Sequence, residues 1–178
     1  MKLISAIVCT TAAMGTSLLL PTVASATDVH CSSDQGIDVT VIDGRTACRA
    51  TSDTSGRARA AGYDGVGYAK ASSGANAFGI GAAGGVGASE GVGGIPIAIG
   101  IGLDAMALTS ISDPGGRGHG GLPLAVSIAI DGSRAGVESA NNAVVCLGSS
   151  AFAWSSATGA TCLATPFGRW QTVPAAIG

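Results

Sequence analysis

A serine in the sequence context of a nucleophile is the first candidate for chemistry in this chain. Ser89 lies in segment 87–91 (GASEG), a match to G-x-S-x-G, and Asp104 or Asp113 and then His119 follow in hydrolase order. A nucleophile elbow needs a strand before the serine and a helix after it, but the glycines and proline that follow cannot begin a helix. A serine hydrolase is therefore only an alternative, and we expect no enzyme activity and no catalytic residues.

A glycine pattern of the dinucleotide-binding type occurs at residues 79–84 (GIGAAG), and Asp104 follows 20 residues beyond it as a candidate ribose ligand. The stretch before the pattern is not a buried apolar strand. The stretch after it is too rich in glycine for the helix that must hold a pyrophosphate. We expect no bound cofactor.

Carboxylates at equivalent positions of a repeat are candidates for a calcium site. Asp104 and Asp131 are such a pair, and Asp113 or Glu138 could add further oxygen ligands. The D-x-D spacing of known calcium loops is absent, as is the C-x-x-C or Cys/His spacing of zinc sites. These residues are predicted to form turns, and no metal site is expected.

The N-terminus has the features of a secretory signal peptide, residues 1–26. Lys2 precedes a weakly apolar run, and a proline and small residues lead to a cleavage site after Ala26. The alternative is an uncleaved membrane anchor, although Ser and Thr dilute the apolar run. We expect a mature single domain of residues 27–178 with no transmembrane helix, either secreted or held in the cell envelope.

Cysteine use agrees with export. The expected mature chain keeps an even number of cysteines, which in a small exported protein implies disulfides: Cys31, Cys48, Cys146 and Cys162. Three pairings can be drawn. We favour Cys31–Cys48 and Cys146–Cys162, because each pair brackets an expected hairpin.

The charge distribution excludes a nucleic-acid partner. The chain has 9 Lys and Arg against 11 Asp and Glu, for a net charge of −2. Its basic residues are interspersed with acids, and no basic patch with interleaved aromatic residues occurs.

The centre of the chain alternates small and large residues. From residue 67 to 93 every odd position is Gly, Ala or Ser, while even positions include Tyr68 and Phe78. A period of two is the strand period. A disordered linker is the alternative, but Glu90 is the only ionisable residue in 71–103, and disordered segments usually carry high charge. We expect strands whose small face lets another sheet approach closely.

A duplicated block follows. Residues 93–104 recur as 120–131, 27 positions further on, and each copy alternates aliphatic residues with small ones, has proline at the second strand position and ends in aspartate. Strict alternation over nine residues predicts a strand. The repeat is compatible with a short β-solenoid or with a flat sheet of two hairpins, and both remain open.

The flanking regions are also expected to be β or irregular. Residues 27–49 are expected to form a hairpin with a turn at Asp43-Gly44, and residues 50–62 a loop or short irregular element. After two C-terminal strands and a return strand at 160–164, the residues from Thr165 onward are expected to be a tail.

Segments 43–50 (DGRTACRA), 65–69 (GVGYA), 84–88 (GGVGA) and 145–148 (VCLG) resemble a family of small exported actinobacterial proteins of uncharacterised function. This resemblance implies export and transfers no catalytic residues. Residues 69–77 (AKASSGANA) look like the head repeats of trimeric autotransporter adhesins, which are stacked β-coils.

The sequence therefore predicts an all-β protein: a Gly/Ala-rich sheet or short β-solenoid with two disulfide-closed hairpins. Its predicted role is a non-enzymatic structural or interaction protein of the cell envelope or extracellular space, which self-associates or binds an envelope partner. An oligomeric envelope pore is an alternative, because nine-residue strands approach membrane-strand length, although the face of small residues is apolar where a lumen should be polar. An uncovered face around Ile97 and Leu124 would indicate a partner.

Overall fold

The computed structural model describes residues 27–112, 122–139 and 143–172. The predicted signal peptide with its cleavage site at Ala26, and the loop with Asp113 and His119, lie outside the described residues. Within the described ranges, no helix is long and apolar enough to cross a membrane.

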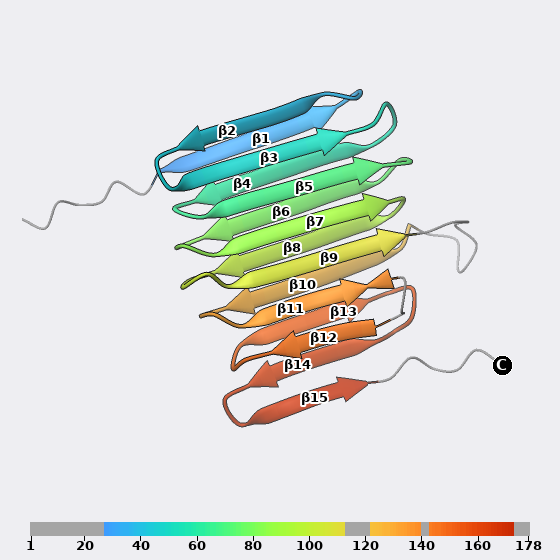
Figure 1. Cartoon of the computed structure of the whole chain (residues 1–178). Helices are drawn as coiled ribbons and strands as arrows, with labels where there is room; N and C mark the ends of the chain where they lie inside the picture. Colours follow the sequence, from blue (N-terminus) through green and yellow to red (C-terminus); the bar gives the residue numbers. More distant parts are fainter. Residues whose placement is uncertain (1–26, 113–121, 140–142, 173–178) are drawn as a thin grey trace, which may run out of the picture.

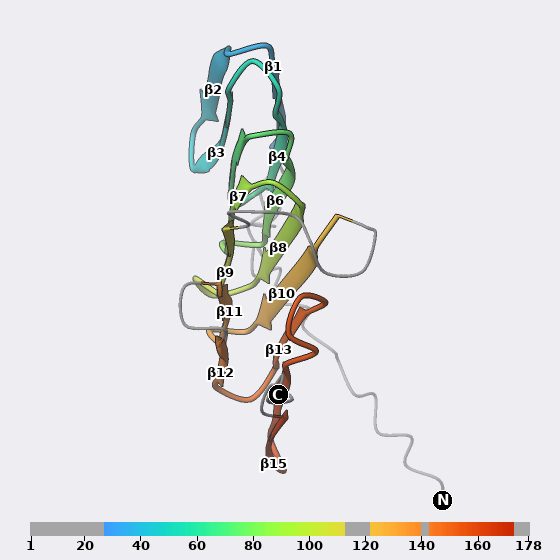
Figure 2. The ribbon, with the colours of Figure 1, turned by 90° about the vertical axis from the view of Figure 1, so that its right-hand side faces the viewer.

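Two β-sheets stacked face to face make up the structure (Figures 1 and 2). The eight-stranded sheet contains, in spatial order, β1 (Asp28–Asp34), β4 (Arg57–Tyr63), β6 (Asn76–Ala82), β8 (Ile95–Ile101), β10 (Leu124–Ile130), β13 (Ala151–Ser155), β14 (Thr161–Thr165) and β15 (Gly168–Thr172). The seven-stranded sheet contains β12 (Ala143–Leu147), β11 (Arg134–Glu138), β9 (Met106–Ser112), β7 (Val86–Val92), β5 (Val66–Ser72), β3 (Thr46–Ser52) and β2 (Asp38–Asp43).

The chain winds between these sheets as a β-solenoid. From β3 to β11 successive strands alternate between the two sheets, so each turn of the coil adds one strand to each sheet. The neighbours within a sheet are therefore parallel: β4, β6, β8 and β10 in one, and β3, β5, β7, β9 and β11 in the other. This confirms the predicted all-β fold and selects the solenoid over the flat sheet.

The duplicated block forms adjacent turns of this coil. Its two copies supply β8 and β10, which pair in parallel with Ile95 opposite Leu124 and Ile99 opposite Ile128. Each strand has seven residues, where nine were expected. The aspartates that end the two copies lie in turns, as predicted, and both have left-handed backbone, with φ 63° for Asp104 and 50° for Asp131.

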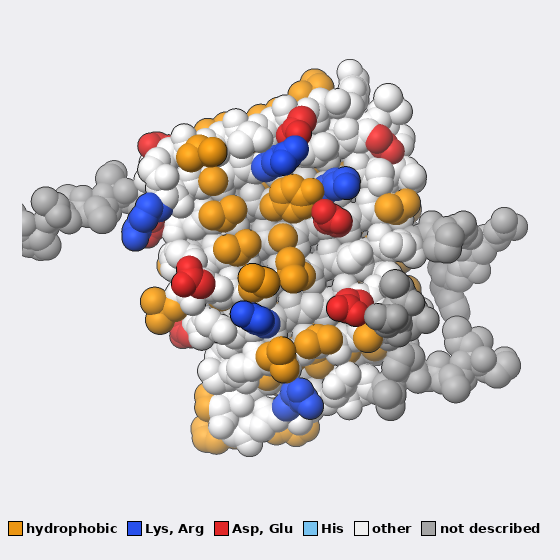
Figure 3. All heavy atoms as spheres, in the orientation of Figure 1, with side chains coloured by type: hydrophobic (Ala, Val, Ile, Leu, Met, Phe, Trp, Pro, Cys, Tyr) orange, Lys and Arg blue, Asp and Glu red, His pale blue; other side chains and the backbone are white. Residues whose placement is uncertain are grey.

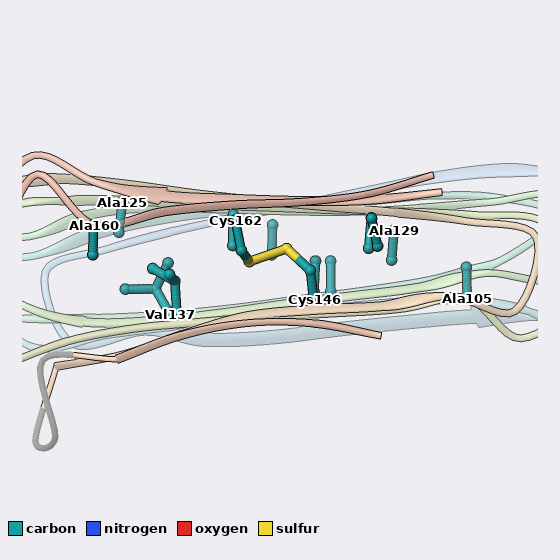
Figure 4. Packing of buried hydrophobic residues seen from close by; sticks show 14 of the residues in the cluster. Ala105, Ala125, Ala129, Val137, Cys146, Ala160 and Cys162 are labelled. Atoms are coloured by element: carbon teal, nitrogen blue, oxygen red, sulfur yellow. A yellow bond between two sulfur atoms is a disulfide. The ribbon is translucent and has the colours of Figure 1, made fainter. Parts of the chain in front are cut away.

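Small side chains fill the space between the sheets. In β5, β6 and β7 the odd-numbered residues point inward and are buried, and the larger even-numbered residues point outward. At Gly87 even a Cβ atom would overlap the carbonyl oxygen of Ile80 in the opposite sheet. The core is therefore a layer of alanine, glycine and serine with a few larger residues. Figure 4 shows part of its alanines, with Val137 and the disulfide among them.

Buried hydroxyls connect the two sheets across this thin core. Ser89 Oγ donates to the carbonyl of Pro96 at 2.9 Å, and Thr109 Oγ1 to that of Ile97 at 3.1 Å. Ser127 Oγ donates in the other direction, to Leu108 O at 3.0 Å. Such bonds satisfy the hydroxyls, which would otherwise be costly to bury.

Antiparallel strands and a disulfide close each end of the solenoid. Cys31 in β1 bonds Cys48 in β3, and Cys146 in β12 bonds Cys162 in β14, as favoured from the sequence. Each bond spans an antiparallel hairpin, β2–β3 or β13–β14, and fixes its second strand to the opposite sheet (Figure 4 shows the second bond). Their Cα–Cα distances of 5.7 and 5.8 Å lie far below the roughly 10 Å of ordinary stacked sheets.

Two sequence expectations were wrong. Residues 50–62 are not a loop, because β3 continues to Ser52 and β4 occupies 57–63. The residues after Thr165 are not simply a tail, because β15 pairs with β14 at the edge of the eight-stranded sheet. The aromatic side chains of this segment lie on the surface, since Phe167 is 95% and Trp170 55% exposed.

Candidate functional site

The serine of the hydrolase-like motif is part of the core. Ser89 is on the inner face of β7 with none of its surface exposed, and its hydroxyl donates to the carbonyl of Pro96. Asp104 lies in the turn after β8. A substrate cannot reach the Ser89 hydroxyl in this arrangement, and no helix follows the motif as an elbow requires.

The glycines of the dinucleotide-like pattern also have a packing role. Gly79 and Gly81 are inner-face positions of β6, where a Cβ would overlap carbonyl oxygens of β5, and Gly84 lies in the following turn with φ 80°. Among the described residues, no group of three or more His, Cys, Asp or Glu is placed to hold a metal ion.

A carboxylate that sequence analysis overlooked organises one corner of the coil. Asp53 Oδ1 accepts from the backbone N–H groups of Ser55 and Gly56, at 2.9 and 2.6 Å, and Oδ2 accepts from that of Ser73, at 2.6 Å. Ser73 belongs to the next turn of the coil, so this side chain ties two successive turns together. The hydrogen bonds from Ser73, Ser55 and Gly56 lower the Asp53 pKa from 3.8 to about 2.

The Asp53 network is expected to make stability depend on pH in acid. Because its folded pKa lies below 3.8, the carboxylate stabilises the fold fully above that value and loses this contribution as the pH falls towards about 2. Asp53→Asn should reduce the slope of unfolding free energy against pH over this window. Denaturant titrations monitored by circular dichroism at several pH values provide the measurement, and identical slopes for the two proteins would contradict the assignment.

The outer face of the seven-stranded sheet mixes charged and apolar side chains (Figure 3). Arg49 makes a two-pronged contact with Asp38, at 2.6 and 3.1 Å, which lowers the pKa of that carboxyl. Tyr68 donates to Glu90 at 3.2 Å, and burial together with this carboxylate raises its pKa. Charges spread in this way are typical of a solvated surface.

One hollow lies on this charged face. It has a volume of about 410 Å³ and forms where Gly136 of β11 leaves a gap between Leu108 of β9 and Val145 of β12. Its rim includes the acids Glu90 and Glu138 and the base Arg134. The mixed charges of this rim favour no single ligand class.

The outer face of the eight-stranded sheet is different. We call its central part the apolar face and define it by twelve outward side chains of β6, β8, β10 and β13: Phe78, Ile80, Ile95, Ile97, Ile99, Ile101, Leu124, Val126, Ile128, Ile130, Phe152 and Trp154. These four strands contain no Asp, Glu, Lys, Arg or His. The pairing, parallel from β6 to β10 and antiparallel between β10 and β13, lines the side chains up in rows across the sheet.

No described strand covers the apolar face. Its residues are half-buried by their neighbours in the same sheet, and Ile101 and Ile130 are each 37% exposed. Leu163 and Trp170 extend the face onto β14 and β15 and are 42% and 55% exposed. Monomeric soluble proteins seldom expose a contiguous patch of this kind unless it binds something.

The sequence indicated that this surface exists, but not which strands lie side by side in it. Ile97 and Leu124 were expected on one face, and the structure places them on adjacent strands of it. The rows joining Phe78 to Ile97 and Val126 to Trp154 depend on strand order, which no local pattern reveals.

A family model described as a family of unknown function (DUF6764) matches residues 1–165. No curated protein and no solved structure matches the chain.

Proposed function

The chain belongs to the family of unknown function DUF6764, and we propose that it is an exported, non-enzymatic protein that acts by binding through its apolar face. The observation that carries this proposal is the contrast between the two outer faces. The outer face of the seven-stranded sheet carries many charged side chains (Figure 3). The outer face of the eight-stranded sheet contains four neighbouring strands without an ionisable side chain. That contrast is typical of a surface with a partner.

The two disulfides support the location in this proposal. Cys31–Cys48 and Cys146–Cys162 are both intramolecular, and such bonds form and persist in oxidising compartments. Together with the predicted signal peptide, they favour the extracellular space or the cell envelope over the cytosol.

The core supports a structural rather than a catalytic role. Its buried polar side chains include Ser89, Thr109 and Ser127, and each hydroxyl is already bonded within the stack. Enzymes usually place reactive groups in a concave site with perturbed pKa values. On the described surface the largest pKa change belongs to Asp53, and its cause is backbone hydrogen bonding in a turn.

Site-specific photo-crosslinking in the producing cells tests the binding surface. A photoreactive residue at Ile97, at the centre of the apolar face, should give covalent adducts of discrete mass. The same residue at Leu108 is the matched control, because it is an exposed aliphatic position on the charged face and should give none. Equal adducts from both positions, or none from Ile97, would contradict the proposal. Fractionation of the same cells tests export.

A further inference from the structure

We infer that the partner of the apolar face is a second copy of this chain, packed face to face about a two-fold axis that runs parallel to the strands between β8 and β10. This inference rests on the proposed function. It commits to a symmetric dimer in which the eight-stranded sheets of two copies lie against each other.

The order of side chains across the face carries the inference. One row, set by strand register, runs Phe78, Ile97, Val126, Trp154: aromatic, aliphatic, aliphatic, aromatic. It is therefore nearly palindromic about the boundary between β8 and β10.

A two-fold axis along that boundary keeps each row at its own height and reverses its order. It places Ile97 over Val126 of the second copy, and Phe78 over Trp154. The aromatic pairs at the two ends are favourable contacts beyond the area that they bury.

The duplicated block explains why the centre of the face is self-complementary. The two strands beside the axis, β8 and β10, are the two copies of the block, paired residue for residue. A two-fold interface places the same surface of both subunits in contact. Here it would place β8 of one copy over β10 of the other, which are two versions of the same strand.

Charge agrees with this occupant, and the area indicates how tightly it binds. A face without ionisable side chains meets its own copy without like-charge repulsion, whereas the charged outer face of the other sheet would not. The four strands of the apolar face, about 4.8 Å apart and with five to seven residues of about 3.3 Å each, give a flat footprint of about 410 Å². Protruding side chains raise the accessible area above this footprint, but it stays below the roughly 800 Å² per partner of a standard interface, so the dimer is expected to be weak and to depend on concentration.

Sedimentation of the purified, oxidised chain is the first test. We expect a concentration-dependent monomer–dimer equilibrium for the wild type. Ile97→Lys should weaken dimerisation at least a hundredfold, because the symmetry buries two unpaired ammonium groups. Leu108→Lys, at an exposed position on the charged face, should leave the equilibrium unchanged. Near-ultraviolet circular dichroism of each variant checks that it is folded.

Cysteine cross-linking tests the geometry without a charge in the interface. Phe78 and Trp154 lie three strand spacings apart within one copy, about 14 Å. In the dimer they face each other across the axis at about 10 Å, the usual spacing of stacked sheets, which a short bismaleimide spans and a disulfide does not. The double variant Phe78→Cys/Trp154→Cys should therefore form a covalent dimer with a bismaleimide of about 10 Å reach, whereas Phe78→Cys alone should not.

A strictly monomeric wild type, or a dimer that Ile97→Lys does not weaken, would overturn the dimer. Flotation with phosphatidylcholine vesicles then separates the remaining outcomes. Vesicle binding that Ile97→Lys abolishes and Leu108→Lys does not would replace the second copy by a lipid surface and leave the proposed binding function in place. A monomer that neither binds vesicles nor gives crosslinks from Ile97 in cells would remove both proposals.

Discussion

Gly87→Val is expected to prevent folding or to lower the free energy of unfolding by about 3 kcal/mol or more. Gly87 lies at the centre of β7, facing the opposite sheet. An added Cβ would overlap the carbonyl oxygen of Ile80 and come within 2.9 Å of that of Ala98. Both carbonyls belong to central strands that are paired on both sides, so neither sheet can yield locally.

Ala88→Val is the matched control for this substitution. Ala88 is the next residue of the same strand, but its side chain points outward and is half-exposed. Valine favours strands, so the change in unfolding free energy should stay within about 0.5 kcal/mol. Denaturant unfolding and the yield of soluble, oxidised protein measure both variants. If Gly87→Val and Ala88→Val lowered the free energy of unfolding by similar amounts, the thin core would not limit side-chain size at Gly87.

The sequence predicted a core of small side chains correctly, because side-chain size alternates along the central strands even though hydrophobicity does not. In the tract from 67 to 93, small residues at odd positions indicated a face for close approach, and those that lie in β5, β6 and β7 are buried. The same logic explains the missed strand β4. Its inward residues Ala58 and Ala60 are small, and Arg57 and Arg59 point outward, so no apolar period marks it as a strand. In this fold the usual hydrophobic pattern is inverted, with aliphatic residues outside and alanine inside.

The arrangement of the duplicated block could not be derived from local pattern. Each copy predicts a strand, but a parallel neighbour and an antiparallel hairpin partner fit that strand equally well. The return strand β9 joins the other sheet, which leaves β8 and β10 adjacent and parallel. The aliphatic residues form continuous rows because strands far apart in the sequence pair with each other. The candidate binding surface therefore appears only when strand order is known.

The pairing of the cysteines was predictable, but its structural meaning was not. The expected hairpins favoured the two pairs that the structure contains. Each bond, however, connects one sheet to the other across the core. A disulfide reaches about 5.5–6 Å between Cα atoms, so it can connect stacked sheets only when they lie unusually close. The small inner residues that bring the sheets together also make the two bonds geometrically feasible.

Removing both disulfides is expected to lower stability by about 6 kcal/mol, since each closes a loop of 16 or 17 residues and contributes about 3 kcal/mol. In a chain of this size that corresponds to a fall in Tm of roughly 12–24 °C. Alanine replacements suit these positions, because Cys48 and Cys162 are each only 1% exposed. Thermal melts of Cys31→Ala/Cys48→Ala, of Cys146→Ala/Cys162→Ala and of the fourfold variant provide the measurement.

The two bonds lie at opposite ends of the solenoid, so their contributions should add if the stack unfolds as one unit. In a coil whose turns contact only their neighbours, loss of one bond should instead loosen the end that it closes. Hydrogen exchange distinguishes these cases. Without Cys31–Cys48, amide protection should fall first in β1 to β3 and persist in β12 to β14, and the converse should hold without Cys146–Cys162. Losses below about 1 kcal/mol for each pair would mean that the alanine core holds its ends closed without a covalent link.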